Sequence, residues 1–361
     1  MHLSDVQATE RRPTIARLLL FCLSALFCVA AAEVTSRAFW RLEYGVPLRD
    51  PARILYAYYP ELREVDRVHP THEDAFYDVL LLDGSVLNPE WGPVEQELSQ
   101  ELASRGHRNV RIFNLATPAQ TSRDSWLKYA ALADARFELV VFYHGINEAR
   151  ANNVPPELFK EDYGHYSWYE TVNALAPYHR TASFALPYTL RYLALQIKHT
   201  LNRRRYVGTD EPRPDWVQYG KDVRSATSFE HNLTAVLDLA TSRGDRALVM
   251  TFATHVPDNY SLAAFKAKRL DYVEYSMPIE VWGEKNNVLN AVAAHNDIVR
   301  RLAAGRPGVL FVDQATLMGE TTGSARDFND PCHLTASGAR RFVSNLLAVL
   351  SPTLPAGDAI R

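Results

Sequence analysis

The feature that most constrains the fold of this chain is a regular alternation of short apolar runs with helical segments. Five apolar runs occur, at 78–82, 110–113, 139–143, 247–252 and 309–312. Runs this short and this apolar are typical of strands that helices cover on both faces. Helices are predicted between and after them, at 93–104, 122–134, 229–240, 289–299 and from 336 onward. The alternation predicts a parallel, doubly wound α/β sheet.

Length and charge narrow the class of protein further. With 361 residues the chain suits one large domain with appendages, and its net charge of -3 argues against a nucleic-acid partner. Two of its three cysteines, Cys22 and Cys28, lie in an apolar N-terminal segment. Cys332 is therefore alone in the remainder, which leaves that part no internal disulfide.

The N-terminal segment, residues 1–33, is predicted to be a targeting element. Arg11, Arg12 and Arg17 precede an uncharged apolar run of 15 residues at 18–32. The run can span a bilayer if Arg17 extends its charged end to the surface, and the basic flank favours an N-terminus on the cytoplasmic side. Small residues at 30–32 also suit cleavage of a signal peptide. Both the anchor and the signal peptide predict an extracytoplasmic location for the rest of the chain.

Two insertions interrupt the α/β pattern of the domain that we expect at 75–352, after an approach segment at 34–74. They lie at about 150–222 and 255–287 and are rich in aromatic residues, which can stack on sugar rings or close a small core. The first insertion contains an amphipathic basic stretch at 187–205. Three interpretations of this stretch remain open. It can rest on anionic lipid beside the anchor, cover the active-site edge as a lid, or pack on the domain with its basic face in water.

Polar residues with catalytic potential follow three of the predicted strands. Ser85 comes just after the first run, Asn147 follows the third, and Asp330 and His333 share one loop beyond the fifth. The carboxyl ends of parallel strands meet at one edge of a sheet, so we expect these side chains to lie together. A serine becomes a nucleophile when a histidine accepts its proton, and a nearby acid orients that histidine. The set predicts acyl-transfer chemistry, and His255, after the fourth run, is a further candidate for binding substrate.

At these residues the chain resembles the SGNH (GDSL-like) hydrolase family over about 75–350. LLLDGSVL matches the block that carries the nucleophile, and Gly145-Ile146-Asn147 and Asp330-x-x-His333 match two later blocks. Residues 114–122 look like the remaining block, with alanine at 116 and 119 where glycine is usual. The resemblance implies a flavodoxin-like three-layer sandwich with a five-stranded parallel sheet.

The resemblance also implies a role for each site residue. Ser85 is the expected nucleophile, His333 its base and Asp330 the acid that orients the base. The expected oxyanion hole consists of the N–H groups of Ser85 and Ala116 and the side-chain amide of Asn147.

The sequence therefore predicts an extracytoplasmic serine esterase that forms a covalent acyl-serine intermediate. Its expected partners are the membrane, through the N-terminal segment, and an ester or an acylated envelope or exported glycan. One alternative is an O-acyltransferase of a polysaccharide, and another is a catalytically degenerate domain that binds glycan or a partner. No histidine, cysteine and aspartate cluster has the spacing of metal ligands, so we expect neither a metal nor another cofactor.

Overall fold

The computed structural model describes residues 6–207, 212–319 and 324–354. The chain divides into two compact units. One consists of 1–60 and 174–201, and the other of 61–173 and 202–361. The site predicted from the sequence lies wholly in the second and larger unit.

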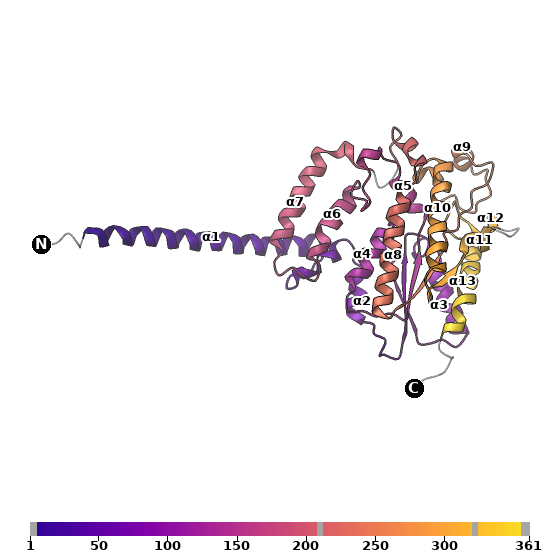
Figure 1. Cartoon of the computed structure of the whole chain (residues 1–361), viewed down its shortest axis with the longest axis horizontal. Helices are drawn as coiled ribbons and strands as arrows, with labels where there is room; N and C mark the ends of the chain where they lie inside the picture. Colours follow the sequence, from indigo (N-terminus) through magenta and orange to yellow (C-terminus); the bar gives the residue numbers. More distant parts are fainter. Residues whose placement is uncertain (1–5, 208–211, 320–323, 355–361) are drawn as a thin grey trace. The chain divides into compact units, whose positions relative to one another are not determined.

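The larger unit is built on a five-stranded sheet in which every strand runs parallel to its neighbours (Figure 1). The strands lie in the order β2-β1-β3-β4-β5. Their bounds are β1 Tyr77–Asp83, β2 Val110–Asn114, β3 Leu139–Tyr143, β4 Arg246–Met250 and β5 Leu310–Val312. Each strand overlaps one of the five apolar runs, so the predicted parallel sheet is confirmed.

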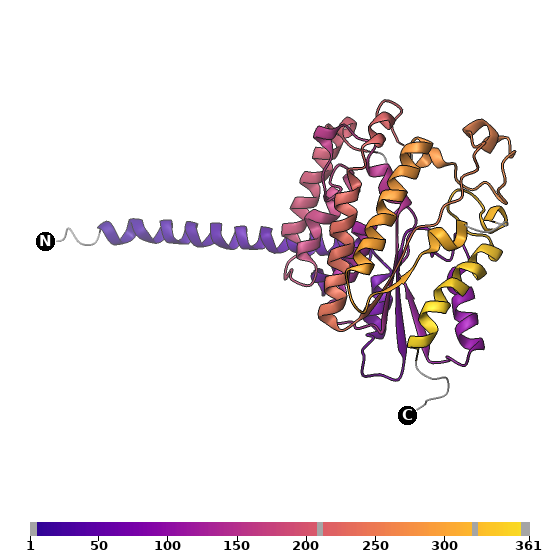
Figure 2. The same ribbon diagram turned by 45° about the vertical axis from the view of Figure 1, so that its right-hand side comes forward.

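Helices cover the sheet in two groups, which gives three layers. One group contains α4 Ser122–Ala131, α8 Ser225–Arg243 and α10 Lys285–Ala304; the other contains α3 Val94–Ser104 and α13 Ala336–Leu350. Figure 2 shows α13 in yellow beside α3 in purple. Strands β1 and β3 are buried at every position because both of their faces are covered. The expected flavodoxin-like sandwich is confirmed.

Short helices complete the larger unit and build much of the two insertions. Their bounds are α2 Leu62–Val68, α5 Ile146–Ala151, η2 Pro156–Leu158, η4 Arg203–Arg205, η5 Val217–Lys221, α9 Leu262–Lys266, η6 Ile279–Val281, α11 Gln314–Gly319, α12 Ser324–Asp327 and η7 Ser351–Thr353. Helix α6, Ser167–Leu175, extends from this unit into the smaller one. Tyr163, Tyr166 and Tyr169 of the first insertion are buried in one cluster with Val207 and Trp216. These aromatic side chains therefore close a small core.

The smaller unit contains α1 Val6–Tyr44, η1 Pro51–Ala57, η3 Ala176–Tyr178 and α7 Leu186–Leu201. Helix α1 continues unbroken past residue 33 to Tyr44, and the domain boundary expected at 33 stays a prediction. Part of the approach segment is folded, since Trp40, Val46 and Ile54 are buried against Tyr188 and its neighbours. From Ile15 to Tyr44, α1 is long and apolar enough to cross a membrane, with a mean hydropathy of 2.3 over its most apolar stretch.

Candidate active site

Ser85, His333 and Asp330 form a continuous hydrogen-bonded chain at the carboxyl edge of the sheet. Ser85 Oγ lies 2.8 Å from His333 Nε2, and His333 Nδ1 lies 2.7 Å from Asp330 Oδ2. When Asp330 Oδ2 accepts a hydrogen bond from the N–H at Nδ1, Nε2 carries the lone pair that faces the serine hydroxyl. All three side chains are buried. The loop predicted from the sequence thus meets the serine across 248 residues of chain.

Backbone N–H groups hold Asp330 in the orientation in which it faces His333. Its Oδ1 accepts hydrogen bonds from the N–H groups of Cys332 and His333, at 3.0 and 2.9 Å. Its Oδ2 accepts a further bond from the N–H of Met277, at 3.0 Å. Three backbone donors on one carboxyl group fix its position. The acid is therefore set in place before any substrate arrives.

Trp91 and Cys332 flank the imidazole on two sides. The ring of Trp91 stacks on His333 with 4.5 Å between centroids and 30° between planes, and Trp91 is half-buried. Cys332 is fully buried, and its Sγ lies 3.7 Å from His333 Nδ1. Burial raises the pKa of this thiol well above its ordinary value, so the thiol is protonated. Both neighbours limit the access of water to the base.

Asp330, Cys332 and His333 also bring three potential metal-ligand atoms within 4.8 Å of one another. His333 Nδ1 already contacts two of these atoms, because it lies 2.7 Å from Asp330 Oδ2 and 3.7 Å from Cys332 Sγ. The expectation that the site works without a metal stays a prediction, and chelation tests it below.

Asp83 shapes the turn that contains Ser85. It ends β1, and its Oδ2 accepts the N–H of Leu87 at 2.6 Å, so the carboxyl group closes the turn that contains Ser85. Burial raises the pKa of Asp83 to about 7. The same turn is tied to the β2–α4 loop, because Asn88 Nδ2 donates to the carbonyl of Ala116 at 2.8 Å. Strand end, turn and neighbouring loop therefore form one connected support for Ser85.

Gly84 is required by the close approach of Asn147. A Cβ atom at position 84 would lie 2.5 Å from Asn147 Nδ2 and 3.1 Å from the carbonyl oxygen of Gln120. Both are closer than a side chain tolerates, so any other residue at 84 displaces the amide. The absence of a side chain allows the Asn147 amide to lie directly beside the nucleophile turn.

The amide of Asn147 is oriented from two sides. Its Nδ2 donates to the carbonyl of Gln120 at 2.7 Å, and its Oδ1 accepts the indole N–H of Trp282 at 2.8 Å. With Oδ1 occupied, the amide cannot turn over without losing both bonds. One Nδ2 proton remains for a developing oxyanion. Trp282 belongs to the second insertion, and sequence reasoning gave it no role in the site.

Contacts from α5 and from the residues just after it hold Trp282 in place. Arg150 Nε donates to the carbonyl of Val281 at 3.0 Å, and Asn153 Nδ2 donates to the carbonyl of Trp282 at 2.8 Å. From α10, His295 Nδ1 lies 2.9 Å from the carbonyl of Gly145, two residues before Asn147. Burial lowers the pKa of His295 to about 4, so it is neutral and structural. The loop after β3 is therefore held by two contacts, one from Trp282 to Asn147 and one from His295 to Gly145.

The oxyanion role predicted for Ala116 does not fit the structure. The N–H of Ala116 donates to Asn114 Oδ1 at 2.9 Å, so this proton is already engaged within the loop. Ala119 is the better candidate from the same loop. It occupies the third position of a turn that closes with a 3.3 Å bond from Gln120 N to Thr117 O, its φ is 64°, and it is exposed. A type II turn with Pro118 at its second position favours glycine there, and alanine accepts it at a cost of about 1–2 kcal/mol.

Lys128 supports the loop from below. It lies on the inward face of α4, fully buried, and its amine contacts Glu61 Oε1, the carbonyl of Leu115 and the hydroxyl of Thr117. Burial lowers the pKa of this amine, while the Glu61 carboxylate favours the charged form. A lysine between Leu127 and Tyr129 on a helix flanking the sheet was the only signal for this role in the sequence.

His255 lies behind the catalytic loop. Its N–H donates to the carbonyl of Pro331 at 2.9 Å, and its ring packs on Phe328 and Tyr272. Burial lowers its pKa. These contacts support the position of the Asp330 loop, and the predicted contact of His255 with substrate stays a prediction.

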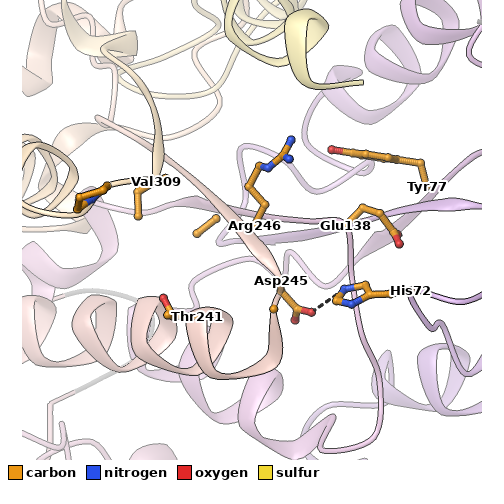
Figure 3. A pocket seen from close by; sticks show the side chains of 11 residues that line it. His72, Tyr77, Glu138, Thr241, Asp245, Arg246 and Val309 are labelled. Atoms are coloured by element: carbon orange, nitrogen blue, oxygen red, sulfur yellow. Dashed lines mark ion pairs between the residues drawn. The ribbon is translucent and has the colours of Figure 1, made fainter. Parts of the chain in front are cut away.

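A second polar cluster lies at the amino edge of the same sheet (Figure 3). It lines a pocket of about 420 Å³ beside the first residues of β1, β4 and the approach to β3. Its side chains include His72, Tyr77, Glu138, Asp245 and Arg246. His72 Nε2 lies 3.1 Å from Asp245 Oδ1 and 3.0 Å from the carbonyl oxygen of Phe137.

Comparison with known proteins found similar chains among solved structures. No protein-family model matches the chain, and no curated protein matches it in sequence. Among solved structures, the chain is similar to a lipase/acylhydrolase from Enterococcus faecalis at 12% identity and a TM-score of 0.42, with 79% of this chain and 100% of that chain covered. It is similar to a GDSL-like lipase from Bacteroides thetaiotaomicron at 11% identity and a TM-score of 0.44, covering 82% and 100%. An acetylxylan esterase from Geobacillus stearothermophilus matches at 11% identity and a TM-score of 0.41, covering 79% and 97%.

Proposed function

We propose that the chain is a serine esterase that acts through a covalent acyl-serine intermediate. The observation that carries this proposal is the relay from Ser85 Oγ to His333 Nε2 and from His333 Nδ1 to Asp330 Oδ2, at 2.8 and 2.7 Å. Both distances are those of formed hydrogen bonds, so the serine already faces its base. A degenerate domain has no need of an assembled relay, and the relay therefore favours the enzyme.

In the first half-reaction Ser85 Oγ attacks the carbonyl carbon of an ester while its proton passes to His333 Nε2. The tetrahedral intermediate collapses, the C–O bond to the alcohol breaks, and the imidazolium returns the proton to the departing alkoxide. In the second half-reaction water attacks the acyl-serine with the same histidine as base, which releases the acid and restores Ser85. Asp330 stabilises the imidazolium in both steps.

The negative charge on the former carbonyl oxygen needs donors that are in place beforehand. We assign this role to the N–H of Ser85, the Nδ2 of Asn147 and the N–H of Ala119, in place of Ala116. Asn147 is held by Gln120 and Trp282, so its remaining proton requires little reorganisation when the charge develops. Each donor of this kind typically contributes about 10²–10³ in turnover.

For localisation we propose that α1 anchors the protein in a membrane, with the enzyme outside the cytoplasm. The 30-residue segment from Ile15 to Tyr44 contains an apolar stretch that supports an anchor by length and composition, and the basic residues before that stretch favour this orientation. An anchored esterase of this kind suits acylated envelope or exported glycans as substrates. Retention of the chain in membranes after high-salt washing, with release by detergent, tests the anchor.

A fluorophosphonate probe tests the enzyme directly. The full chain in detergent is expected to bind the probe covalently at Ser85, whereas the Ser85→Ala variant and heat-unfolded protein are not. Labelling is expected to persist in excess chelator, because no step of the mechanism uses a metal. Failure of well-folded protein to react would exclude an activated serine and with it the esterase.

The same preparation separates hydrolysis from acyl transfer. Acetate release from p-nitrophenyl acetate is measured with and without added oligosaccharide, together with the acetylated sugar. Hydrolysis predicts that acetate accounts for the nitrophenol formed under both conditions. Accumulation of acetylated oligosaccharide at the expense of acetate identifies a transferase instead.

A further inference from the structure

Helix α7 carries an apolar stripe that no part of its own unit covers. Leu190, Leu193, Ile197 and Leu201 are 58, 49, 62 and 78% exposed. Their spacing of three and four residues places them on one face of the helix. Phe184, just before the helix begins, is 61% exposed as well. Five large apolar side chains facing outward from one short segment require an apolar environment.

The opposite face of α7 is packed against the chain that follows the apolar run of α1. Thr189 Oγ1 accepts the indole N–H of Trp40 at 2.8 Å, and Tyr188 donates its hydroxyl to the carbonyl of Pro51 at 3.2 Å. The hydroxyls of Tyr44 and Tyr192 lie 2.8 Å apart. The buried face is therefore turned toward residues 40–51. The exposed stripe lies on the other side of the helix, away from residues 40–51.

Glu33 fixes the level at which α7 meets α1. Its carboxylate accepts the N–H groups of Ala185 and Leu186, both at 2.8 Å, and so caps the start of α7. Glu33 directly follows the apolar run at 18–32. Figures 1 and 2 both show α7 crossing α1 steeply rather than running along it. If α1 crosses a bilayer, α7 starts at the bilayer's surface and lies along it.

The charges around the stripe match an anionic surface. Arg191 and Lys198 flank it on α7, and Arg203, Arg204 and Arg205 follow the helix in the chain. The sequence contains no acidic residue between Glu170 and Asp210. Apolar residues on one face with basic residues at its border are the pattern of helices that lie in the interface of anionic membranes.

We propose that α7 is an interfacial helix whose stripe of Leu190, Leu193, Ile197 and Leu201 inserts into the leaflet from which α1 emerges, with its basic residues on anionic phospholipid headgroups. This inference rests on the proposed anchoring by α1, and it adds a second attachment. A single spanning helix leaves the unit free to rotate about the helix axis. Insertion of α7 removes that freedom and gives the unit one fixed side toward the lipid.

Nitroxide accessibility in nanodiscs tests the inference with the full chain. Cys22 and Cys28 are exposed and are replaced by alanine, whereas Cys332 is buried and does not react. A nitroxide is then attached through Ile197→Cys. Val273→Cys, at an apolar side chain 58% exposed in the larger unit, is the matched control. Native Cys28, retained in a Cys22→Ala background, reports separately whether α1 is inserted. One chain per nanodisc prevents a second copy from covering the stripe.

In nanodiscs of phosphatidylcholine with phosphatidylglycerol, the label at 197 is expected to lose accessibility to a nickel chelate and gain accessibility to oxygen, as the label at Cys28 does. The label at 273 is expected to stay accessible to the chelate. Replacing Arg191 and Lys198 with glutamate, or omitting phosphatidylglycerol, is expected to restore chelate access at 197. A label at 197 as accessible as that at 273, with Cys28 protected, overturns the inference and leaves the anchor intact. Equal protection without phosphatidylglycerol overturns the role of the anionic headgroup.

Discussion

The two edges of the sheet each hold a histidine paired with an aspartate, and the pairs differ in which ring nitrogen they use. At the carboxyl edge Asp330 takes Nδ1 of His333, which leaves Nε2 facing Ser85 at 2.8 Å. At the amino edge Asp245 Oδ1 and the carbonyl of Phe137 both lie next to Nε2 of His72. The first histidine can accept a proton from a nucleophile, whereas the second has the corresponding nitrogen occupied by acceptors.

The hydrogen-bond partners of the two aspartates, Asp330 and Asp245, also differ. Asp330 receives three backbone N–H groups, and the site beside it contains a serine and an oriented amide. Asp245 accepts hydrogen bonds from the hydroxyl of Tyr129 and the N–H of Phe137. These bonds tie the start of β4 to α4 and to the loop before β3. Burial raises the pKa of Asp245. A histidine–aspartate contact alone therefore does not define a catalytic site; a nucleophile on the free nitrogen does.

The largest effect on activity is expected from removal of the proposed nucleophile at the carboxyl edge. Ser85→Ala is expected to lower kcat for p-nitrophenyl acetate by a factor on the order of 10⁶, as removal of a serine nucleophile does in other relays. His72→Ala, at the other edge, is expected to change kcat by less than about twofold because it touches no reacting atom. A comparable loss in both variants contradicts the assignment of the site to one edge.

Exchanging each acid for its amide compares the two pairs directly. Asp330→Asn is expected to lower kcat by about 10⁴, because the amide favours the wrong tautomer of His333. Asp245→Asn is expected to leave kcat nearly unchanged and to reduce the free energy of unfolding by about 1–3 kcal/mol, since buried donors lose their acceptor. Urea unfolding and initial rates on the same preparations provide both readouts.

Trp282→Phe tests the orientation of the oxyanion donor. The variant keeps the ring but removes the N–H that bonds Asn147 Oδ1, so the amide is free to turn. A lost hydrogen bond of about 1 kcal/mol predicts a fall in kcat of roughly fivefold to tenfold with KM unchanged. The effect is expected to vanish in an Asn147→Ala background. Additive losses in the double variant indicate that Trp282 acts through some other contact.

The smallest effect concerns the pH dependence of stability. Burial raises the pKa of Glu148, beside Asn147, to about 7 from an ordinary 4.5. The folded state therefore keeps a proton that the unfolded state has lost between these values. The stabilisation from the neutral carboxyl is complete below pH 4.5 and is lost as the pH rises through 7.

Glu148→Gln removes this titration, so its Tm is expected to rise relative to the native protein by an amount on the order of 3 °C between pH 5 and 8. Glu138→Gln, at the half-buried amino edge, is the control and is expected to show a smaller change. A Tm difference between Glu148→Gln and the native protein that is constant with pH contradicts the raised pKa.

Much of the fold could be predicted because its signal is local. The strands β1 to β5 are short apolar runs, and the residues that end them are polar, so their common edge follows from parallel topology. The donor from the β2–α4 loop could not be predicted, because Ala116 and Ala119 are the same residue type. They differ in backbone conformation, and that depends on a bond to Asn114 and a turn at Pro118. The contact of Trp282 with Asn147 could not be predicted either, because 135 residues separate the two in the sequence.

Helix α7 shows the same limit. The stretch at 187–205 left three interpretations open because its periodicity cannot tell a covered face from a free one. Only the contacts of Tyr188 and Thr189 identify the packed side of α7 and so reveal that the apolar stripe is on the other.

The cysteines have a consequence for how the protein matures. Cys332 is sealed beside His333 with its thiol protonated, and Cys22 and Cys28 lie six residues apart on one helix, too far for a bond to each other. Folding therefore requires no disulfide formation within the chain, and no thiol oxidoreductase is needed for it. The protein is expected to mature at the same rate in reducing and in oxidising surroundings.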